Sequence, residues 1–159
     1  MAKVYILTGP IASGKTHWAL ERKKNKATVH LSCDDLMLNL FPVCLGSRHA
    51  QTEARCLNFL FGQAVQLYEM GLDCVIDAGF WTGKSRMDAL SYFKERGIKA
   101  EIYYFECSRD IRLERLARRN QELEKTKKLA YIIDEKLFDR LDQKYEKPLP
   151  GEYHCLVKT

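Results

Sequence analysis

The stretch Gly9-Pro10-Ile11-Ala12-Ser13-Gly14-Lys15-Thr16 matches the pattern G-x-x-x-x-G-K-[ST] at every defined position. The glycines permit a tight loop whose backbone N–H groups can face a phosphate. In such a loop the lysine reaches the outer phosphates of a nucleotide, and the threonine hydroxyl can bind Mg²⁺. The alternative interpretation is a glycine-rich turn with an exposed lysine. The residues expected around the phosphates are Gly9, Ile11, Ala12, Ser13, Gly14, Lys15 and Thr16.

Acidic residues stand at the ends of two later apolar segments. Asp34 and Asp35 directly follow one segment, and Asp77 ends the other. In-line phosphoryl transfer needs one carboxylate near the metal and another that accepts a hydroxyl proton. We assign Asp77 to the metal, Asp34 to the proton, and Asp35 to the start of a helix. Helix capping is the alternative role for Asp34, and proton acceptance is the alternative role for Asp35.

The basic residues are concentrated in one segment. The chain has a net charge of +5, and residues 109–128 hold eight Lys or Arg against four acidic residues. Arg115 and Arg119 are four residues apart and therefore share one helical face, while Ile111 and Leu116 are expected to face the sheet. This concentration suits a local phosphate-binding element better than a groove for a long polyanion. A solvated charged face is the alternative.

The positions of these residues follow from the expected elements. Strands that alternate with helices predict an α/β fold with a parallel sheet covered on both faces, and such sheets bind ligands at the carboxyl ends of their strands. Apolar runs predict strands over residues 3–8, 28–32, 74–77, 99–106 and 153–157. Helices are predicted over 15–24, 50–68, 84–96, 109–119 and 134–145, with a further one starting at Asp34-Asp35 and a break at Pro42 and Gly46.

Length and composition narrow the class of protein. With 159 residues, 46% of them hydrophobic and 30% charged, the chain is expected to form a single globular domain over residues 1–159. No apolar run approaches the ~20 residues of a membrane span, and the first residues lack the long apolar stretch of a signal peptide. We therefore expect a cytoplasmic protein without a membrane partner.

The cysteines are read as reduced thiols, most of them buried, rather than as disulfides. None forms a C-x-x-C pair, and the nearest approach to metal-ligand spacing is His30 with Cys33, so a zinc site is not expected. The six are Cys33, Cys44, Cys56, Cys74, Cys107 and Cys155.

Four stretches together resemble the P-loop kinases of the nucleoside-monophosphate-kinase superfamily. The likeness is closest to the small single-domain branch with polynucleotide 5′-hydroxyl kinases, chloramphenicol phosphotransferases and zeta-toxin-like kinases. It implies the P-loop NTPase fold, a three-layer α/β/α sandwich with a five-stranded parallel sheet and a helical lid at about 119–131, and ATP- and Mg²⁺-dependent transfer of a γ-phosphoryl group to a hydroxyl. The four stretches are Gly9 to Thr16, Leu31 to Leu36, Val75 to Phe80 with Arg86, and Arg115 to Asn120.

The resemblance also implies roles for single residues. In that family the first Asp after the second strand is commonly the general base, which matches Asp34, and the Asp ending the third strand serves the metal, which matches Asp77. The first Arg of the lid-type Arg-x-x-x-Arg stacks on adenine and the second reaches the phosphates, which match Arg115 and Arg119. The residues assigned to catalysis are Lys15, Asp34 and Arg119, and those assigned to the metal are Thr16 and Asp77.

One departure from the pattern bears on the acceptor. Polynucleotide kinases tend to carry an Arg shortly after the Asp pair, whereas this chain has Leu36-Met37-Leu38-Asn39. An apolar substrate wall favours a small, partly apolar hydroxyl compound over nucleic acid, with an acceptor pocket built from residues ~36–60. A polynucleotide 5′-hydroxyl kinase and a nucleotide-gated switch that hydrolyses ATP slowly remain alternatives.

The sequence leaves alternatives for Arg86, for the segment 145–152 and for the oligomeric state. Arg86 is interpreted either as a phosphate clamp or as part of a surface salt bridge. The segment 145–152 resembles the closing segment of many uncharacterised family members, without an assigned role. The protein is expected to be a monomer or a homodimer.

Overall fold

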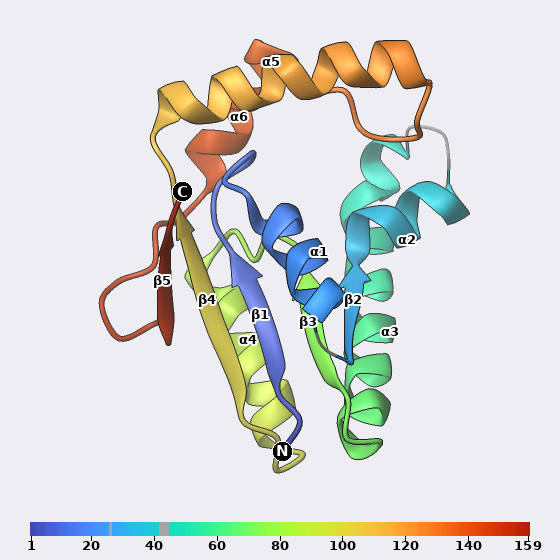
Figure 1. Cartoon of the computed structure of the whole chain (residues 1–159), viewed down its shortest axis with the longest axis vertical. Helices are drawn as coiled ribbons and strands as arrows, with labels where there is room; N and C mark the ends of the chain where they lie inside the picture. Colours follow the sequence, from blue (N-terminus) through green and yellow to red (C-terminus); the bar gives the residue numbers. More distant parts are fainter. Residues whose placement is uncertain (26, 42–44) are drawn as a thin grey trace.

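Five strands form one parallel sheet in the order β2-β3-β1-β4-β5 (Figure 1). The computed structural model describes residues 1–25, 27–41 and 45–159; Pro42 and Cys44 therefore lie outside the described residues. The five-stranded parallel sheet predicted from the sequence is confirmed. The strands are β1 (Val4–Thr8), β2 (Thr28–Ser32), β3 (Asp73–Asp77), β4 (Ala100–Glu106) and β5 (Cys155–Lys158).

The predicted helices are present, and one is longer than predicted. The helix expected to end at residue 119 continues to Thr126, where Lys127 caps it in a left-handed conformation with φ of 50°. The helices are α1 (Lys15–Asn25), α2 (Cys33–Leu40), α3 (His49–Glu69), α4 (Gly83–Lys94), α5 (Arg109–Thr126) and α6 (Glu135–Lys144), with a short 3-10 turn η1 (Gly46–Arg48).

The central strand β1 is buried along its whole length. All five of its residues are inaccessible to solvent, and it pairs in parallel with β3 on one side and β4 on the other. Leu7 lies opposite Asp77 of β3. This register brings the loop after β1 next to the carboxyl end of β3.

Helices cover both faces of the sheet, and two more lie across its end. On one face, Ala19 of α1 packs against Tyr5 and Leu7 of β1. On the other, Phe61 of α3 and Phe93 of α4 pack into the core. Figure 1 shows α1 in front of the sheet, α3 and α4 behind it, and α5 lying across the carboxyl ends of the strands.

Side-chain caps fix where several helices begin. Ser32 accepts a hydrogen bond from the backbone N–H of Asp35 at the start of α2. Thr82 and Ser85 form a reciprocal capping box at the start of α4. Such caps satisfy N–H groups that have no partner within the helix, and each typically contributes about 1 kcal/mol.

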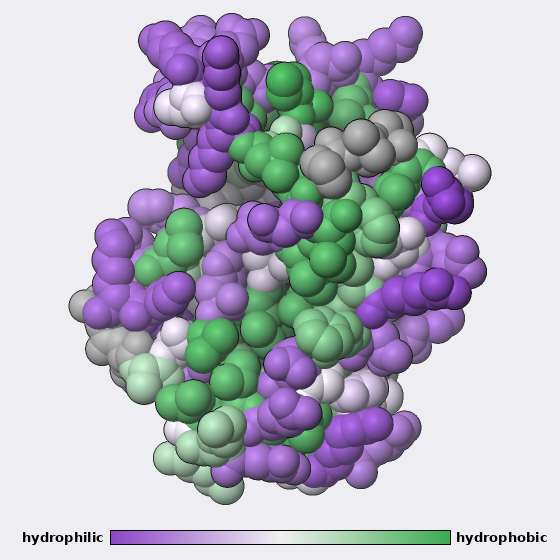
Figure 2. All heavy atoms as spheres, turned by 90° about the vertical axis from the view of Figure 1, so that its right-hand side faces the viewer, coloured by the Kyte–Doolittle hydropathy of each residue, from purple (hydrophilic) through white to green (hydrophobic). Residues whose placement is uncertain are grey.

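The side of the molecule formed by α2 and α3 carries a band of apolar residues among polar ones (Figure 2). Leu40, Phe41 and Phe59 are among the exposed apolar side chains from these elements and their ends. Within the described parts of the chain, no helix is both long and apolar enough to cross a membrane.

Candidate active site

The backbone of the loop between β1 and α1 requires glycine at positions 9 and 14. A Cβ atom at Gly9 would lie 2.8 Å from the carbonyl oxygen of Phe105, a backbone atom that cannot move aside, and Gly14 has φ of +94°. Ala12 also adopts a left-handed conformation, with φ of 59°. Non-glycine residues rarely hold this conformation, and such strain clusters at ligand-binding sites.

The tip of the loop is held from outside. Ile11 and Ala12 pack against the apolar cluster of Leu116, Ile133 and Phe138 formed by α5, α6 and the segment before α6. Ser13 is inaccessible to solvent. The conformation of the loop is therefore coupled to the helices that lie across the sheet.

The ammonium group of Lys15 lies inside the curve of the loop. Its Nζ donates hydrogen bonds to the carbonyl oxygens of Gly9 at 2.8 Å and Pro10 at 2.9 Å. Burial lowers the pKa of Lys15, while the negative charges of Asp77 and Asp34 act in the opposite direction. The lysine is thus close to both predicted carboxylates and faces the space that the loop encloses.

Thr16 and Asp77 meet at the start of α1. Thr16 Oγ1 donates to Asp77 Oδ2 at 2.6 Å, and His30 Nε2 lies 3.4 Å from the same oxygen. Burial alone would raise the pKa of Asp77, but the hydrogen bonds from His30 and Thr16 and the charge of Lys15 together hold it below its ordinary value. The carboxylate therefore stays ionised at neutral pH.

These groups fit a magnesium ion. Mg²⁺ prefers oxygen ligands and in nucleotide sites is usually held by one or two protein groups, phosphate oxygens and water. Thr16 Oγ1 and Asp77 Oδ2 supply two adjacent oxygens of this kind. Among the described residues no cluster of three or more His, Cys, Asp or Glu forms a complete protein cage for a metal.

Asp34 lies in the first turn of α2, exposed to solvent at the same edge of the sheet. Desolvation and the charges of Asp77 and Glu53 raise its pKa, and those of Lys15 and Arg119 partly oppose the rise. Because water reaches this carboxylate, the effect of neighbouring charges is partly screened. A raised pKa favours proton acceptance from a hydroxyl group.

The predicted division between capping and catalysis at Asp34-Asp35 needs correction. The capping side chain is that of Ser32, whose Oγ accepts from Asp35 N at 3.1 Å, so neither aspartate caps α2. Ser, Asp and Asn are about equally good caps, so the sequence Ser32-Cys33-Asp34-Asp35 did not distinguish between them.

Arg115 and Arg119 project from α5 toward different parts of the site. Arg115 Nη1 lies 3.2 Å from Thr159 Oγ1, and a Cβ atom at Gly14 would be 3.6 Å from the same nitrogen. Arg119 Nη2 donates to the carbonyl oxygen of Tyr131 at 3.2 Å. Arg115 is therefore beside the phosphate-binding loop, and Arg119 is bound to the segment that follows α5.

That segment crosses toward α2 and α3. The rings of Tyr131 and His49 lie edge to face with centroids 6.1 Å apart, and Figure 1 shows the connection after α5 descending beside the start of α3. Burial and the negative charges of Asp34 and Glu53 raise the pKa of Tyr131. Tyr131 and Glu53 thus lie near Asp34, although no spacing in the sequence indicated them.

Three expectations about individual side chains are wrong. Met37 and Leu38 are buried, and Met37 packs with Cys33, Cys56 and Leu60 instead of forming a substrate wall. Ile111 is 41% exposed and does not face the sheet, whereas Leu116 is buried as expected.

Arg86 is neither a phosphate clamp nor part of a surface salt bridge. It is 2% exposed and forms an ion pair with Glu152 at 3.2 Å. Its other terminal nitrogen donates to the carbonyl oxygens of Phe80 and Glu146. Arg86 thus joins α4 to the distant segment 145–152. The sequence showed only that the residue is charged and did not predict this contact.

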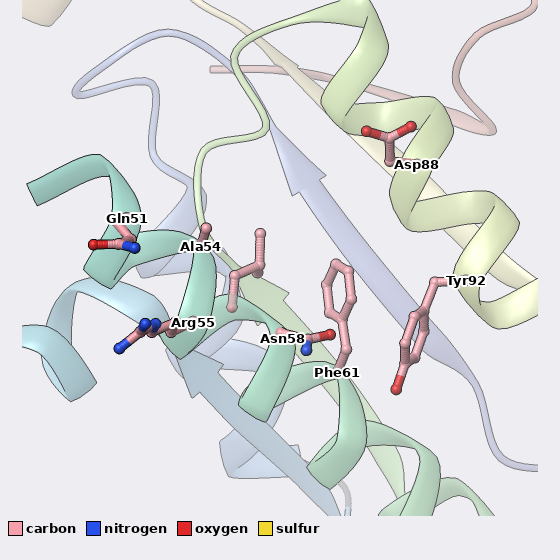
Figure 3. A pocket seen from close by; sticks show the side chains of 8 residues that line it. Gln51, Ala54, Arg55, Asn58, Phe61, Asp88 and Tyr92 are labelled. Carbon is pink, nitrogen blue, oxygen red and sulfur yellow. The ribbon is translucent and has the colours of Figure 1, made fainter.

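A pocket of about 470 Å³ opens between α3 and α4, away from the phosphate-binding loop (Figure 3). Phe61 and Tyr92 form part of its apolar wall, with Arg55 and Asp88 at its sides. None of the residues predicted for catalysis, phosphate binding or metal binding lines it. The α3 residues that line this pocket lie within 51–61, but they are on a different face of the helix from the one near Asp34.

A family model described as an AAA domain matches residues 4–148. No protein in the curated comparison matches the sequence. The structure of the Mycobacterium tuberculosis APS kinase CysC in complex with AMPPNP and APS is similar, with 19% identity, a TM-score of 0.69, and coverage of 99% of this chain and 88% of that one.

Two further solved structures are similar over most of this chain. The Pnkp1/Rnl/Hen1 RNA repair complex matches with 20% identity, a TM-score of 0.69, and coverage of 90% of this chain and 43% of that one. The tunicamycin resistance protein of Deinococcus radiodurans matches with 15% identity, a TM-score of 0.62, and coverage of 100% and 87%. At these identities the likeness shows a shared fold.

Proposed function

The chain belongs to the AAA domain family whose model matches residues 4–148, and from this premise we propose that it is an ATP-dependent kinase acting on a hydroxyl group of a small molecule. The observation that carries the proposal is the convergence of Lys15, Thr16 and Asp77 with Asp34 at one edge of the sheet. Thr16 is hydrogen-bonded to Asp77, and Lys15 is close enough to both carboxylates for their charges to act on its pKa.

In the proposed reaction the phosphate chain of ATP lies in the loop, with Lys15 beside the β- and γ-phosphates. The hydroxyl oxygen of the acceptor attacks the γ-phosphorus while the bond to the β–γ bridging oxygen breaks and ADP leaves. The hydroxyl proton passes to the carboxylate of Asp34. Thr16 and Asp77 would hold Mg²⁺, which would supply positive charge to neutralise the phosphate oxygens.

The two arginines of α5 would contact ATP from the helix that lies across the carboxyl ends of the strands. Arg115 lies beside Gly14 and would stack on the adenine, because a planar guanidinium suits stacking. Arg119 would reach the phosphates once the lid, proposed for residues 119–131 of a single domain, closes and excludes water. In the structure Arg119 donates to Tyr131 within this segment.

The surroundings of Asp34 bear on the acceptor. The stretch Leu36-Met37-Leu38-Asn39 provides no Arg, and Glu53 adds negative charge beside Asp34. Negative charge disfavours binding of an anion such as a nucleic-acid phosphate. We therefore favour a neutral or cationic hydroxyl compound over an oligonucleotide.

The test is a screen with ATP labelled at the γ-phosphate. The purified protein is incubated with Mg²⁺ and pools of small hydroxyl compounds, and separately with 5′-hydroxyl oligonucleotides, and label transfer is measured with Lys15→Ala as the control. Transfer to a small compound supports the proposal. Transfer only to oligonucleotides would favour a polynucleotide kinase, and ATP binding without transfer to any acceptor would favour a nucleotide-gated switch.

A further inference from the structure

The turn that follows Asp77 is bound by a segment about seventy residues further along the chain. We call residues 145–152 the strap. The strap leaves α6 and passes the turn formed by residues 78–82 before reaching β5. The proposed reaction uses neither the strap nor Arg86, although both stood out in the sequence.

Arg86 links the strap to the turn from within the protein. Its Nη1 donates to the carbonyl oxygens of Phe80 at 3.2 Å and Glu146 at 2.9 Å, and its Nη2 donates to Glu152 Oε2 at 3.2 Å. A buried guanidinium is costly unless such partners are present. Three acceptors from two separate segments therefore depend on this one side chain.

Two hydrogen bonds formed by Glu146 reinforce the same contact. Its backbone N–H donates to the carbonyl oxygen of Trp81 at 2.8 Å. Its carboxylate Oε2 accepts from the backbone N–H of Gly83 at 2.7 Å, at the start of α4. The strap thus binds the second half of the turn and the start of α4.

The turn needs this support because its backbone is strained. Phe80 has φ of 46° and Gly79 has φ of 80°. A bulky residue holds a left-handed conformation only where its surroundings determine it. The Phe80 ring lies parallel to that of Phe61, with an interplanar angle of 5°, so the core also fixes this residue.

The same turn is joined to the phosphate-binding loop. Thr8, the last residue of β1, precedes Gly9 directly, and its Oγ1 donates to the carbonyl oxygen of Phe80 at 3.0 Å. That oxygen therefore accepts from Thr8 on the loop side and from Arg86 on the strap side. It is three residues from Asp77.

We propose that Arg86 is a positioning residue which, through the strap, holds the turn after Asp77 in register with the phosphate-binding loop and so sets the affinity of the site for a divalent cation. This inference rests on the proposed function, because it assigns Asp77 to the metal. Arg86 is buried and binds only the turn and the strap among the described residues. Its effect passes through Phe80 and the short backbone from Phe80 to Asp77.

The test compares Glu152→Ala with Lys147→Ala. Glu152→Ala removes the ionic partner of Arg86, whereas Lys147→Ala, also in the strap, removes only the exposed ion pair with Glu106. Mn²⁺ binding to the folded full-length protein with a non-hydrolysable ATP analogue is measured by electron paramagnetic resonance. We expect the Kd for Mn²⁺ to rise about 10-fold in Glu152→Ala, the lower end of the range for losing groups that orient a metal ligand, and to stay unchanged in Lys147→Ala.

Further measurements separate positioning from a purely structural role. Glu152→Gln keeps an oxygen acceptor and should restore most of the Mn²⁺ affinity, and binding of the nucleotide without metal should not change in any variant. If Glu152→Ala lowers only the melting temperature and binds Mn²⁺ as the unmodified protein does, the proposal is overturned. Should Glu152→Ala not fold, Glu146→Ala, which removes only the side-chain acceptor of Gly83 N–H, decides by the same criterion. An unmodified protein that binds neither nucleotide nor Mn²⁺ would refute the proposed function and this inference together.

Discussion

Thr16 Oγ1 donates a hydrogen bond of 2.6 Å to Asp77 Oδ2, which ties the first turn of α1 to the carboxyl end of β3. The two residues are 61 positions apart, and they belong to separate motifs. Parallel pairing of β1 with β3 brings them together, since Leu7 lies opposite Asp77.

Replacing Lys15 by alanine should abolish most of the stabilisation that ATP and Mg²⁺ confer. Nucleotide that binds only the folded state raises the melting temperature, and losing a charged hydrogen bond to phosphate weakens binding by about 10- to 100-fold. The fold should remain intact, because the lysine is bonded only to its own loop. Thermal unfolding with and without ATP-Mg²⁺ measures this. The control is Lys84→Ala on the exposed side of α4, and an undiminished shift in Lys15→Ala would show that the loop does not bind the nucleotide through this residue.

Asp34→Asn should make the ligand-free protein more stable at neutral pH. A carboxyl group whose pKa is raised in the folded state destabilises folding once it is ionised, and this penalty disappears as the pH falls below its unfolded value of about 3.9. The gain from the amide should therefore be largest near pH 7 and shrink toward pH 4. Urea unfolding across this range measures it. A variant less stable than the unmodified protein at pH 7 would contradict the direction of the pKa shift.

The free thiols offer a test of the burial pattern. Burial raises the pKa of Cys33 and of Cys74 to about 12, so little reactive thiolate forms at neutral pH. In the native protein these two and the buried Cys56 should react slowly with a thiol reagent, and the half-buried Cys107 and Cys155 faster. In denaturant without reductant all six cysteines should react, and two or fewer would overturn the assignment of reduced thiols.

Two aspartates of α6 provide a matched pair for stability. Arg112 is 5% exposed and binds both oxygens of Asp142, whereas Arg109 and Asp139 form an exposed pair. Asp142→Ala should lower the free energy of unfolding by about 2–3 kcal/mol. This is somewhat less than the loss expected on breaking a fully buried pair, because Asp142 is partly accessible to solvent. Asp139→Ala should cost about 0.2–1 kcal/mol. Equal losses in chemical denaturation would mean that Arg112 does not depend on its partner.

Periodicity and motif spacing were enough to predict the strands and the loop, because each depends on local sequence, and the alternation of strands with helices predicted a parallel sheet. The apolar run in β1 predicted a strand buried on both faces, and Gly9 and Gly14 predicted a loop that no larger residue could form. The end of α5 was misjudged, since the polar residues from Asn120 to Thr126 carry no glycine or proline that would stop a helix.

The side chains whose surroundings were predicted wrongly are placed by tertiary contacts. Nothing next to Arg86 in the sequence indicated that it is buried, because the acceptors that make its burial possible come from the strap, sixty or more residues later. His30 was noted only for its spacing from Cys33, whereas its contact is with Asp77 on the neighbouring strand. Parallel strands join residues that no local spacing relates.

The proposed mechanism requires Asp34 to accept the proton of a hydroxyl group during phosphoryl transfer, and Asp34→Asn tests this step. The amide keeps the shape of the side chain but cannot take the proton, while the adjacent Asp35→Asn, whose main-chain N–H is bonded to Ser32, is the control. We measure transfer of the γ-phosphoryl group to the acceptor found by screening, together with ATP affinity. We expect the rate of transfer to fall by at least about 10²-fold in Asp34→Asn, with ATP affinity little changed. Asp35→Asn should transfer the phosphoryl group at a rate close to that of the unmodified protein. If Asp34→Asn transfers the phosphoryl group at the rate of the unmodified protein, Asp34 is not the proton acceptor, whatever the nucleotide affinity.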